Sequence, residues 1–76
     1  MQGPDYKVSS YLAEYDQIEP ATRVKYALDI YNDPNARNLY CFKLLIRDLN
    51  SQSMQDRASK LLQNAFDFWP NMKIAS

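Results

Sequence analysis

The stretch from Asp33 to Asn50 constrains the fold most, because it combines a helix start with the densest apolar stripe of the chain. Asp33 suits an N-cap, since its carboxylate can accept hydrogen bonds from the free amides of a first turn. Pro34 follows at the first helical position, where a missing N–H costs nothing. Apolar and aromatic side chains then recur over most of the helix circumference: Leu39, Tyr40, Cys41, Phe42, Leu44, Leu45, Ile46 and Leu49. Such a helix is buried on more than one side, so we predict a core helix over residues 34–49.

Two helices are predicted before this stretch. The first covers residues 5–16, and the second covers residues 20–32 with Pro20 at its first position. The apolar and aromatic positions of the first helix share one face: Val8, Tyr11, Leu12 and Tyr15. Pro34 pushes the residue before it out of the helical region. The second helix is therefore expected to end near Asn32 and to join the core helix by a very tight turn.

A fourth helix is predicted over residues 54–69, followed by a tail over residues 70–76. Ser53 and Asp56 have the spacing of a capping box, with Asp in place of the usual Glu or Gln. Pro70 is expected to end the helix. Its apolar stripe has helical spacing throughout: Met54, Ala58, Leu61, Leu62, Ala65, Phe66 and Trp69.

These elements predict an all-α fold class, a small bundle of three to four short helices joined by tight turns. The helices belong to a single domain over residues 1–76, with antiparallel neighbours where the connections are short. The expected core consists of ten residues from all four helices: Leu12, Val24, Leu28, Leu39, Phe42, Leu45, Leu49, Leu61, Leu62 and Phe66.

Composition narrows the class of protein. Hydrophobic residues make up 46% of the 76 residues and aromatic residues 13%, which argues against disorder. Nine basic and nine acidic residues give zero formal charge, which removes the simplest electrostatic case for nucleic acid or an anionic membrane. No apolar run approaches the ~20 residues that a membrane span needs, and no signal-peptide pattern is present. The single Cys41 excludes an intrachain disulfide and suits a reducing compartment, so we expect a small soluble cytoplasmic protein.

The residues that catalysis usually needs are scarce. Without histidine, the chain cannot form Ser-His or Cys-His nucleophiles or His-based metal sites. Gly3 is the only glycine, so phosphate-binding and dinucleotide-binding glycine loops are excluded. The opening of an EF-hand loop near Asp29 fails, because Pro34 and Tyr40 occupy its essential Gly and Glu positions. We expect that the protein is not an enzyme and binds no cofactor or metal. Cys41 is interpreted as a buried structural cysteine.

Basic residues offer one functional hypothesis. Lys43 and Arg47 share a face of the third helix, and Arg57 and Lys60 share a face of the fourth. A small helix-turn-helix-like regulator could bind nucleic acid through these four side chains. Against it, the turns lack the usual glycine and both helices are rich in apolar residues, so an ordinary solvated face is the competing interpretation.

Aromatic residues offer the favoured hypothesis. Six tyrosines, three phenylalanines and one tryptophan are too many for one small core, and Tyr and Trp are enriched at protein interfaces. We predict a non-catalytic protein–protein interaction module, such as a small regulator, adaptor or inhibitor, that binds another protein or a second copy of itself as a homodimer. Its predicted partner-binding residues are Tyr11, Tyr15, Tyr26 and Trp69. The competing interpretation is that tyrosines at helix rims only cover the core.

Overall fold

The fold is all-α, as the sequence predicts. The computed structural model describes residues 4–72 and, within them, four α-helices and one short 3-10 helix, with no strand. The helices are α1 (Pro4–Glu14), α2 (Pro20–Asn32), α3 (Leu39–Ser51) and α4 (Gln55–Ala65), and the 3-10 helix η1 (Tyr15–Gln17) follows α1. None of the helices in residues 4–72 combines the length and apolarity that crossing a bilayer requires.

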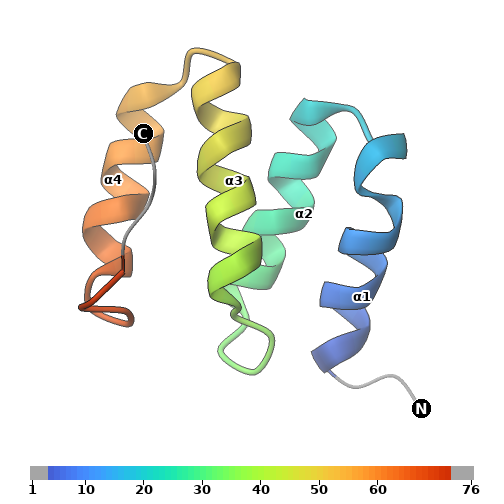
Figure 1. Cartoon of the computed structure of the whole chain (residues 1–76), viewed down its shortest axis with the longest axis horizontal. Coiled ribbons are helices and arrows are strands. Elements are labelled where there is room, and N and C mark those ends of the chain that lie inside the picture. The colour runs from blue at the N-terminus through green and yellow to red at the C-terminus, as the bar shows by residue number, and fades with distance from the viewer. Residues whose placement is uncertain (1–3, 73–76) are drawn as a thin grey trace.

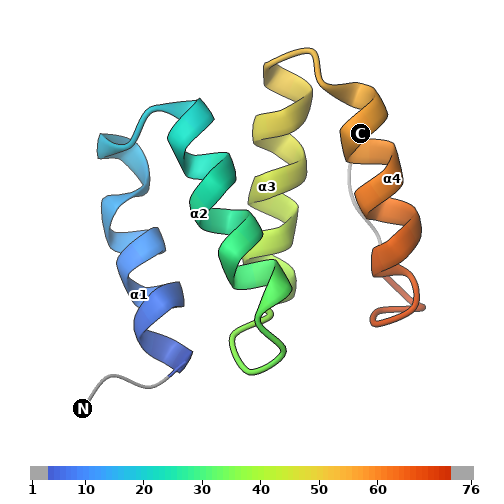
Figure 2. The same ribbon diagram turned by 180° about the vertical axis from the view of Figure 1, so that it is seen from behind.

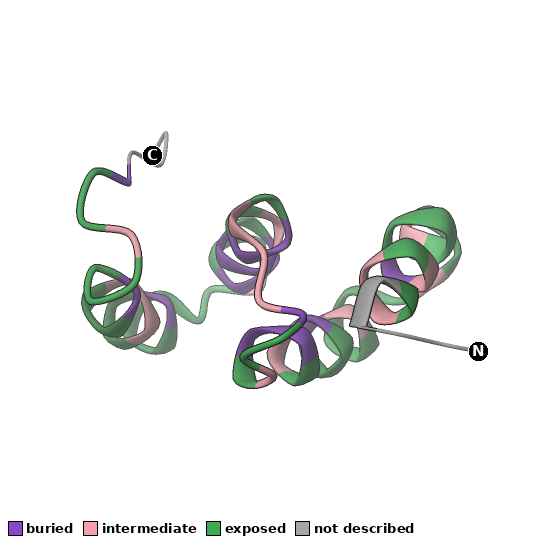
Figure 3. Cartoon of the chain, turned by 90° about the horizontal axis from the view of Figure 1, so that it is seen from below, coloured by how far each residue is buried: buried purple, intermediate pink, exposed green. Residues whose placement is uncertain are grey.

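The four helices stand side by side and alternate in direction, so that the molecule is a flat slab (Figures 1 and 2). Viewed along the helices, α1 and α3 lie at one level and α2 and α4 at the other (Figure 3). The most extensive contact joins α2 to α3, and further contacts join α3 to α4 and α1 to α2. Each helix therefore packs mainly against its neighbours in the chain.

The third helix begins at Leu39 rather than at the predicted Pro34. Asn38 is its N-cap, and the Asn38 Oδ1 atom accepts a hydrogen bond from the Cys41 amide at 3.1 Å. Asp33 instead ends α2, and its Oδ1 atom accepts a hydrogen bond from the Asn35 amide at 2.9 Å. Both residue types suit an N-cap equally well. Residues 33–38 consequently form a loop where the sequence predicted a very tight turn.

The fourth helix ends at Ala65, four residues before the predicted end. Phe66, the following residue, starts a turn, in which the Trp69 amide donates a hydrogen bond to the Ala65 carbonyl at 2.9 Å. The predicted capping box at Ser53 is also wrong. Ser53 has a φ of 60°, in the left-handed region, and Met54 occupies the N-cap position without a side-chain hydrogen bond. Similarly, α1 stops at Glu14 and tightens into η1 instead of continuing to residue 16.

The core agrees with the prediction in the centres of α2 and α3. Val24, Phe42, Leu45 and Leu49 are buried, and four predicted residues pack against them in part: Leu28, Leu39, Leu61 and Leu62. Leu12 and Phe66 were predicted wrongly, because they are 39% and 48% exposed. Several buried residues were missing from the predicted core: Tyr11, Ala27, Ile30, Tyr31, Ala36, Ile46, Ala58, Ala65 and Met72.

Cys41 is buried as expected. Its side chain is 1% exposed, and burial raises the pKa of the thiol. A thiol with a raised pKa carries little thiolate at neutral pH, so it is a poor nucleophile. Cys41 therefore serves the packing of α3.

Candidate partner-binding site

Tyr15, a predicted partner-binding residue, makes its polar and aromatic contacts with other residues of this chain. Its hydroxyl donates to the Asp48 carboxylate at 3.2 Å, and the Arg23 guanidinium lies over its ring at 4.1 Å. Arg23 also donates to both carboxylate oxygens of Asp48, at 3.0 and 2.9 Å, and this pairing raises the pKa of Arg23. The Arg23 Nη1 atom donates to the backbone carbonyls of Tyr15 and Ile18 at 3.0 and 3.1 Å. Tyr15 thus joins η1 to α2 and α3.

Tyr11 lies in the core and not on a surface that a partner could reach. Its side chain is 0% exposed and packs edge-on against Tyr15 at 5.7 Å between ring centres. A ring without exposed area cannot contact another protein in this conformation, so Tyr11 has to be removed from the predicted binding residues. Tyr26, which packs against Tyr11 at 6.5 Å, is 40% exposed and keeps an accessible face on α2.

Trp69 belongs to a different part of the molecule. It packs against Phe42 at 5.5 Å, Phe68 at 6.1 Å and Tyr31 at 6.4 Å between ring centres. We call these four residues the C-terminal aromatic cluster. Within residues 4–72, no ring-to-ring contact joins this cluster to the three tyrosines near α1. The four predicted binding residues therefore do not form one face.

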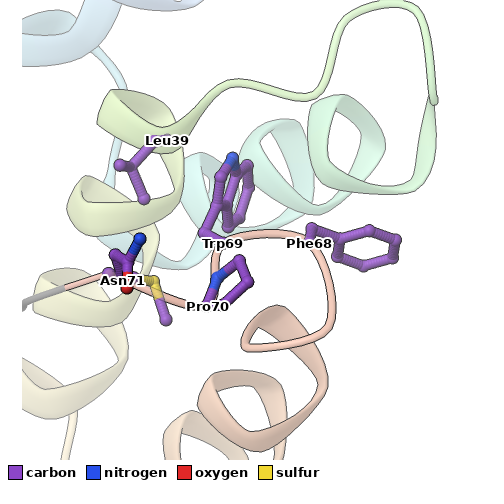
Figure 4. A pocket seen from close by; sticks show the side chains of 6 residues that line it. Leu39, Phe68, Trp69, Pro70 and Asn71 are labelled. Carbon is purple, nitrogen blue, oxygen red and sulfur yellow. The ribbon is translucent and has the colours of Figure 1, made fainter.

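A surface pocket of about 300 Å³ opens beside the C-terminal aromatic cluster. Figure 4 shows Trp69 between Leu39, from the start of α3, and Phe68. Apolar side chains make up most of the lining, with one amide: Leu39, Phe68, Trp69, Pro70, Asn71 and Met72. The early end of α4 creates this arrangement, because the chain then turns back and its Met72 amide donates to the Trp69 carbonyl at 3.0 Å. Such a pocket can accept an apolar side chain.

Arg37 lies against Phe68, one of the residues that line the pocket. Its guanidinium carbon lies 3.8 Å from the centre of the Phe68 ring, and its Nε donates to the Tyr31 carbonyl at 2.8 Å. The same guanidinium lies 5.4 Å from the centre of the Tyr31 ring. Two aromatic contacts and one hydrogen bond therefore fix the position of this cation.

The four basic residues of the alternative hypothesis are all exposed, but they form two separate pairs. On α3, Arg47 points to η1, and its Nη2 lies 3.5 Å from the Tyr15 hydroxyl. Lys43 shares that helix with Arg47, whereas Arg57 and Lys60 lie on α4 beside the exposed Asp56. In the described part of the chain, no hydrogen bond or ion pair connects the two pairs.

Neither a family model, nor a curated protein, nor a solved structure matches this chain. Among the described residues, no three His, Cys, Asp or Glu side chains lie close enough together to hold a metal ion. Of the pocket residues, sequence reasoning singled out only Trp69 as a binding residue. The aromatic run from Phe66 to Trp69 was a visible signal for this site, but it was assigned to a helix that the structure ends earlier.

Proposed function

We propose that this protein is a non-catalytic protein–protein interaction module, of the kind used by small regulators, adaptors and inhibitors. The observation that carries the proposal is the apolar pocket, whose wall includes Phe68, a residue that is 47% exposed. Covering apolar surface is favourable by roughly 25 cal/mol per Å². An aromatic side chain and a pocket at one place on the surface therefore favour docking of an apolar group from a partner.

The support beneath the pocket strengthens the proposal. Trp69 rests on Phe42, which is 2% exposed, and Met72 is 8% exposed. A wall held by core residues keeps its shape in the free protein, which lowers the entropy that binding has to remove. This support favours a pocket that keeps its shape in the free protein.

Selection from a displayed random peptide library, with the folded protein as bait, tests this function. We expect the selected peptides to lose about tenfold or more in affinity for the Phe68→Ala variant, as the loss of an interface anchor implies. Tyr40→Ala is the matched control, because Tyr40 is a 60% exposed aromatic residue that does not line the pocket. A library without binders, or binders that tolerate Phe68→Ala, would contradict the proposal.

We rank nucleic-acid binding second, on the exposure of Lys43, Arg47, Arg57 and Lys60. Such binding would weaken steeply as salt increases, because each phosphate contact releases counterions. Replacing Lys43 and Arg47 together by Met should reduce both the affinity for a short duplex and its salt dependence. Binding that is insensitive to salt would remove this alternative.

A further inference from the structure

We infer that the partner presents a large apolar side chain, such as Phe, with an Asp or Glu side chain one or two residues away in an extended segment. The apolar side chain occupies the pocket, and the carboxylate binds Arg37. This inference rests on the proposed function, since it specifies the ligand of the same pocket.

The first argument is the state of the Arg37 guanidinium. Arginine carries five N–H donors, and in residues 4–72 only the Arg37 Nε has a hydrogen-bond acceptor, the Tyr31 carbonyl. No carboxylate of the described residues lies within ion-pair distance of Arg37. The fixed guanidinium therefore presents its two terminal nitrogens without an acidic partner, and a carboxylate matches that fork of donors.

The acidic residues nearest in the chain do not fill this role. Asp33, in the same loop, binds Lys7 at 3.0 Å and accepts from the Asn35 amide, and these contacts hold the pKa of its carboxyl below the usual value. Asp67, which precedes Phe68, is exposed and forms no ion pair with any described residue. Among the described residues, therefore, no acidic group pairs with Arg37, and a carboxylate from a partner would complement its charge.

The second argument is the position of Phe68, which belongs to both features. Its ring lines the pocket and also stacks against the Arg37 guanidinium at 3.8 Å. Residues of an extended chain advance by roughly 3.3–3.6 Å, so a peptide can reach both features with side chains close in sequence. The volume of about 300 Å³ is at the lower end of ligand pockets and suits one side chain. The pocket opens at the surface, where a peptide can reach it.

Titration of the fluorescence of Trp69, the single tryptophan, tests the inference. The probe is the acetylated and amidated peptide Ser-Gly-Phe-Glu-Gly-Ser, compared with versions carrying Gln for Glu or Ala for Phe. We expect the Gln peptide to bind about fivefold more weakly, as the loss of one surface ion pair implies. The Ala peptide should lose most of its binding.

Substitution of Arg37 locates the effect. In Arg37→Met the Glu and Gln peptides should bind equally, because Met keeps an apolar side chain against Phe68 and removes the charge. Lys43→Met is the matched control, since it removes an exposed cation on α3 that does not line the pocket, and it should keep the preference for Glu. A preference for Glu that survives Arg37→Met would overturn the inference.

Other occupants of the pocket give different results. A peptide ending in Phe with a free carboxylate that binds best would assign Arg37 to a chain terminus, and a homodimer that Phe68→Ala dissociates would assign the pocket to a second copy. Either result, or failure of the Glu peptide to bind, overturns the inference. Library peptides that depend on Phe68 but lack acidic residues would overturn it while leaving the proposed function intact.

Discussion

The carboxylate of Asp48 connects three elements of the fold and contributes to its stability. It is 3% exposed and binds Arg23 and Tyr15, which come from two other elements. Asp48→Ala leaves the Arg23 guanidinium, whose side chain is 14% exposed, without its partner. We expect the free energy of unfolding to fall by about 3 kcal/mol, because a broken buried pair leaves an uncompensated charge. Urea denaturation followed by circular dichroism measures the change.

The matched control for Asp48 is Asp29→Ala. Asp29 pairs with Lys7 at 3.3 Å, but its side chain is 66% exposed, and water screens such a pair. The midpoint of denaturation should therefore hardly change in Asp29→Ala. Equal losses in the two variants would show that the burial of Asp48 has no special role.

A second prediction at the residue scale concerns Tyr11 and alkaline pH. The Tyr11 hydroxyl is buried without a hydrogen-bond partner in the described residues, and burial, followed by the charge of Asp48, raises its pKa. Above pH ~10 the unfolded chain loses this phenol proton while the folded chain keeps it, so stability falls as pH rises. Tyr11→Phe should raise stability at neutral pH by about 1 kcal/mol and make this alkaline loss smaller.

Thermal unfolding between pH 7 and 11 checks the prediction for Tyr11. Part of the alkaline loss should remain in Tyr11→Phe, since burial also raises the pKa of Tyr31. Tyr6→Phe serves as the control, because Tyr6 is 51% exposed and its hydroxyl reaches water. A Tyr11→Phe variant less stable than the parent would mean that the hydroxyl has a partner.

At the scale of the element, the N-cap of α3 gives the sharpest prediction. Asn38→Ala removes the acceptor of the Cys41 amide and should lower the free energy of unfolding by about 1 kcal/mol. Asn35→Ala, in the same loop, is the control, because Asn35 is exposed and contributes only its backbone amide to Asp33. Equal effects of the two substitutions on urea denaturation would contradict the assignment of the cap.

The same element shows why the sequence predicted helix centres better than helix ends. Repeated apolar positions fix which residues of α3 face the core, and Phe42, Leu45 and Leu49 are buried as that pattern requires. The choice between Asp33 and Asn38 as the cap depends on tertiary contacts. Ala36 is buried and Arg37 donates to the Tyr31 carbonyl, so the loop over residues 33–38 folds against α2. Neither contact leaves a signal in local sequence.

For the whole molecule, the uneven contacts between helices predict uneven protection of backbone amides. Contacts are most extensive between α2 and α3, whereas α1 and α4 each pack mainly against one neighbouring helix. We expect amides in α2 and α3 to exchange with deuterium most slowly and those in α1 and α4 to exchange first, because edge elements open locally at lower free energy. Mass spectrometry of exchanged peptides measures this order, and uniform protection over the four helices would contradict it.

The candidate site was predictable only in part, for reasons that belong to this same scale. Trp69 was predicted as a binding residue because it is a large amphipathic ring, and it lines the pocket. The prediction placed Leu12 in the core and Tyr11 at the surface, whereas the structure buries Tyr11 and exposes Leu12. Neighbouring residues differ by about 100° around a helix, so a small error in the orientation of α1 exchanges their environments. The pocket itself joins Leu39 to Met72, which are far apart in sequence. The packing of α4 on α3, continued by Trp69 against Phe42, brings them together.

This construction of the pocket has a mechanical consequence. Tension applied to the two ends would separate an edge helix first, and removing α4 from α3 would also pull Met72 away from Leu39. The pocket therefore exists only while α4 is docked, and a ligand that fills it must hold α4 in place by its own binding free energy. A bound partner would thus raise the force needed to separate α4 from α3.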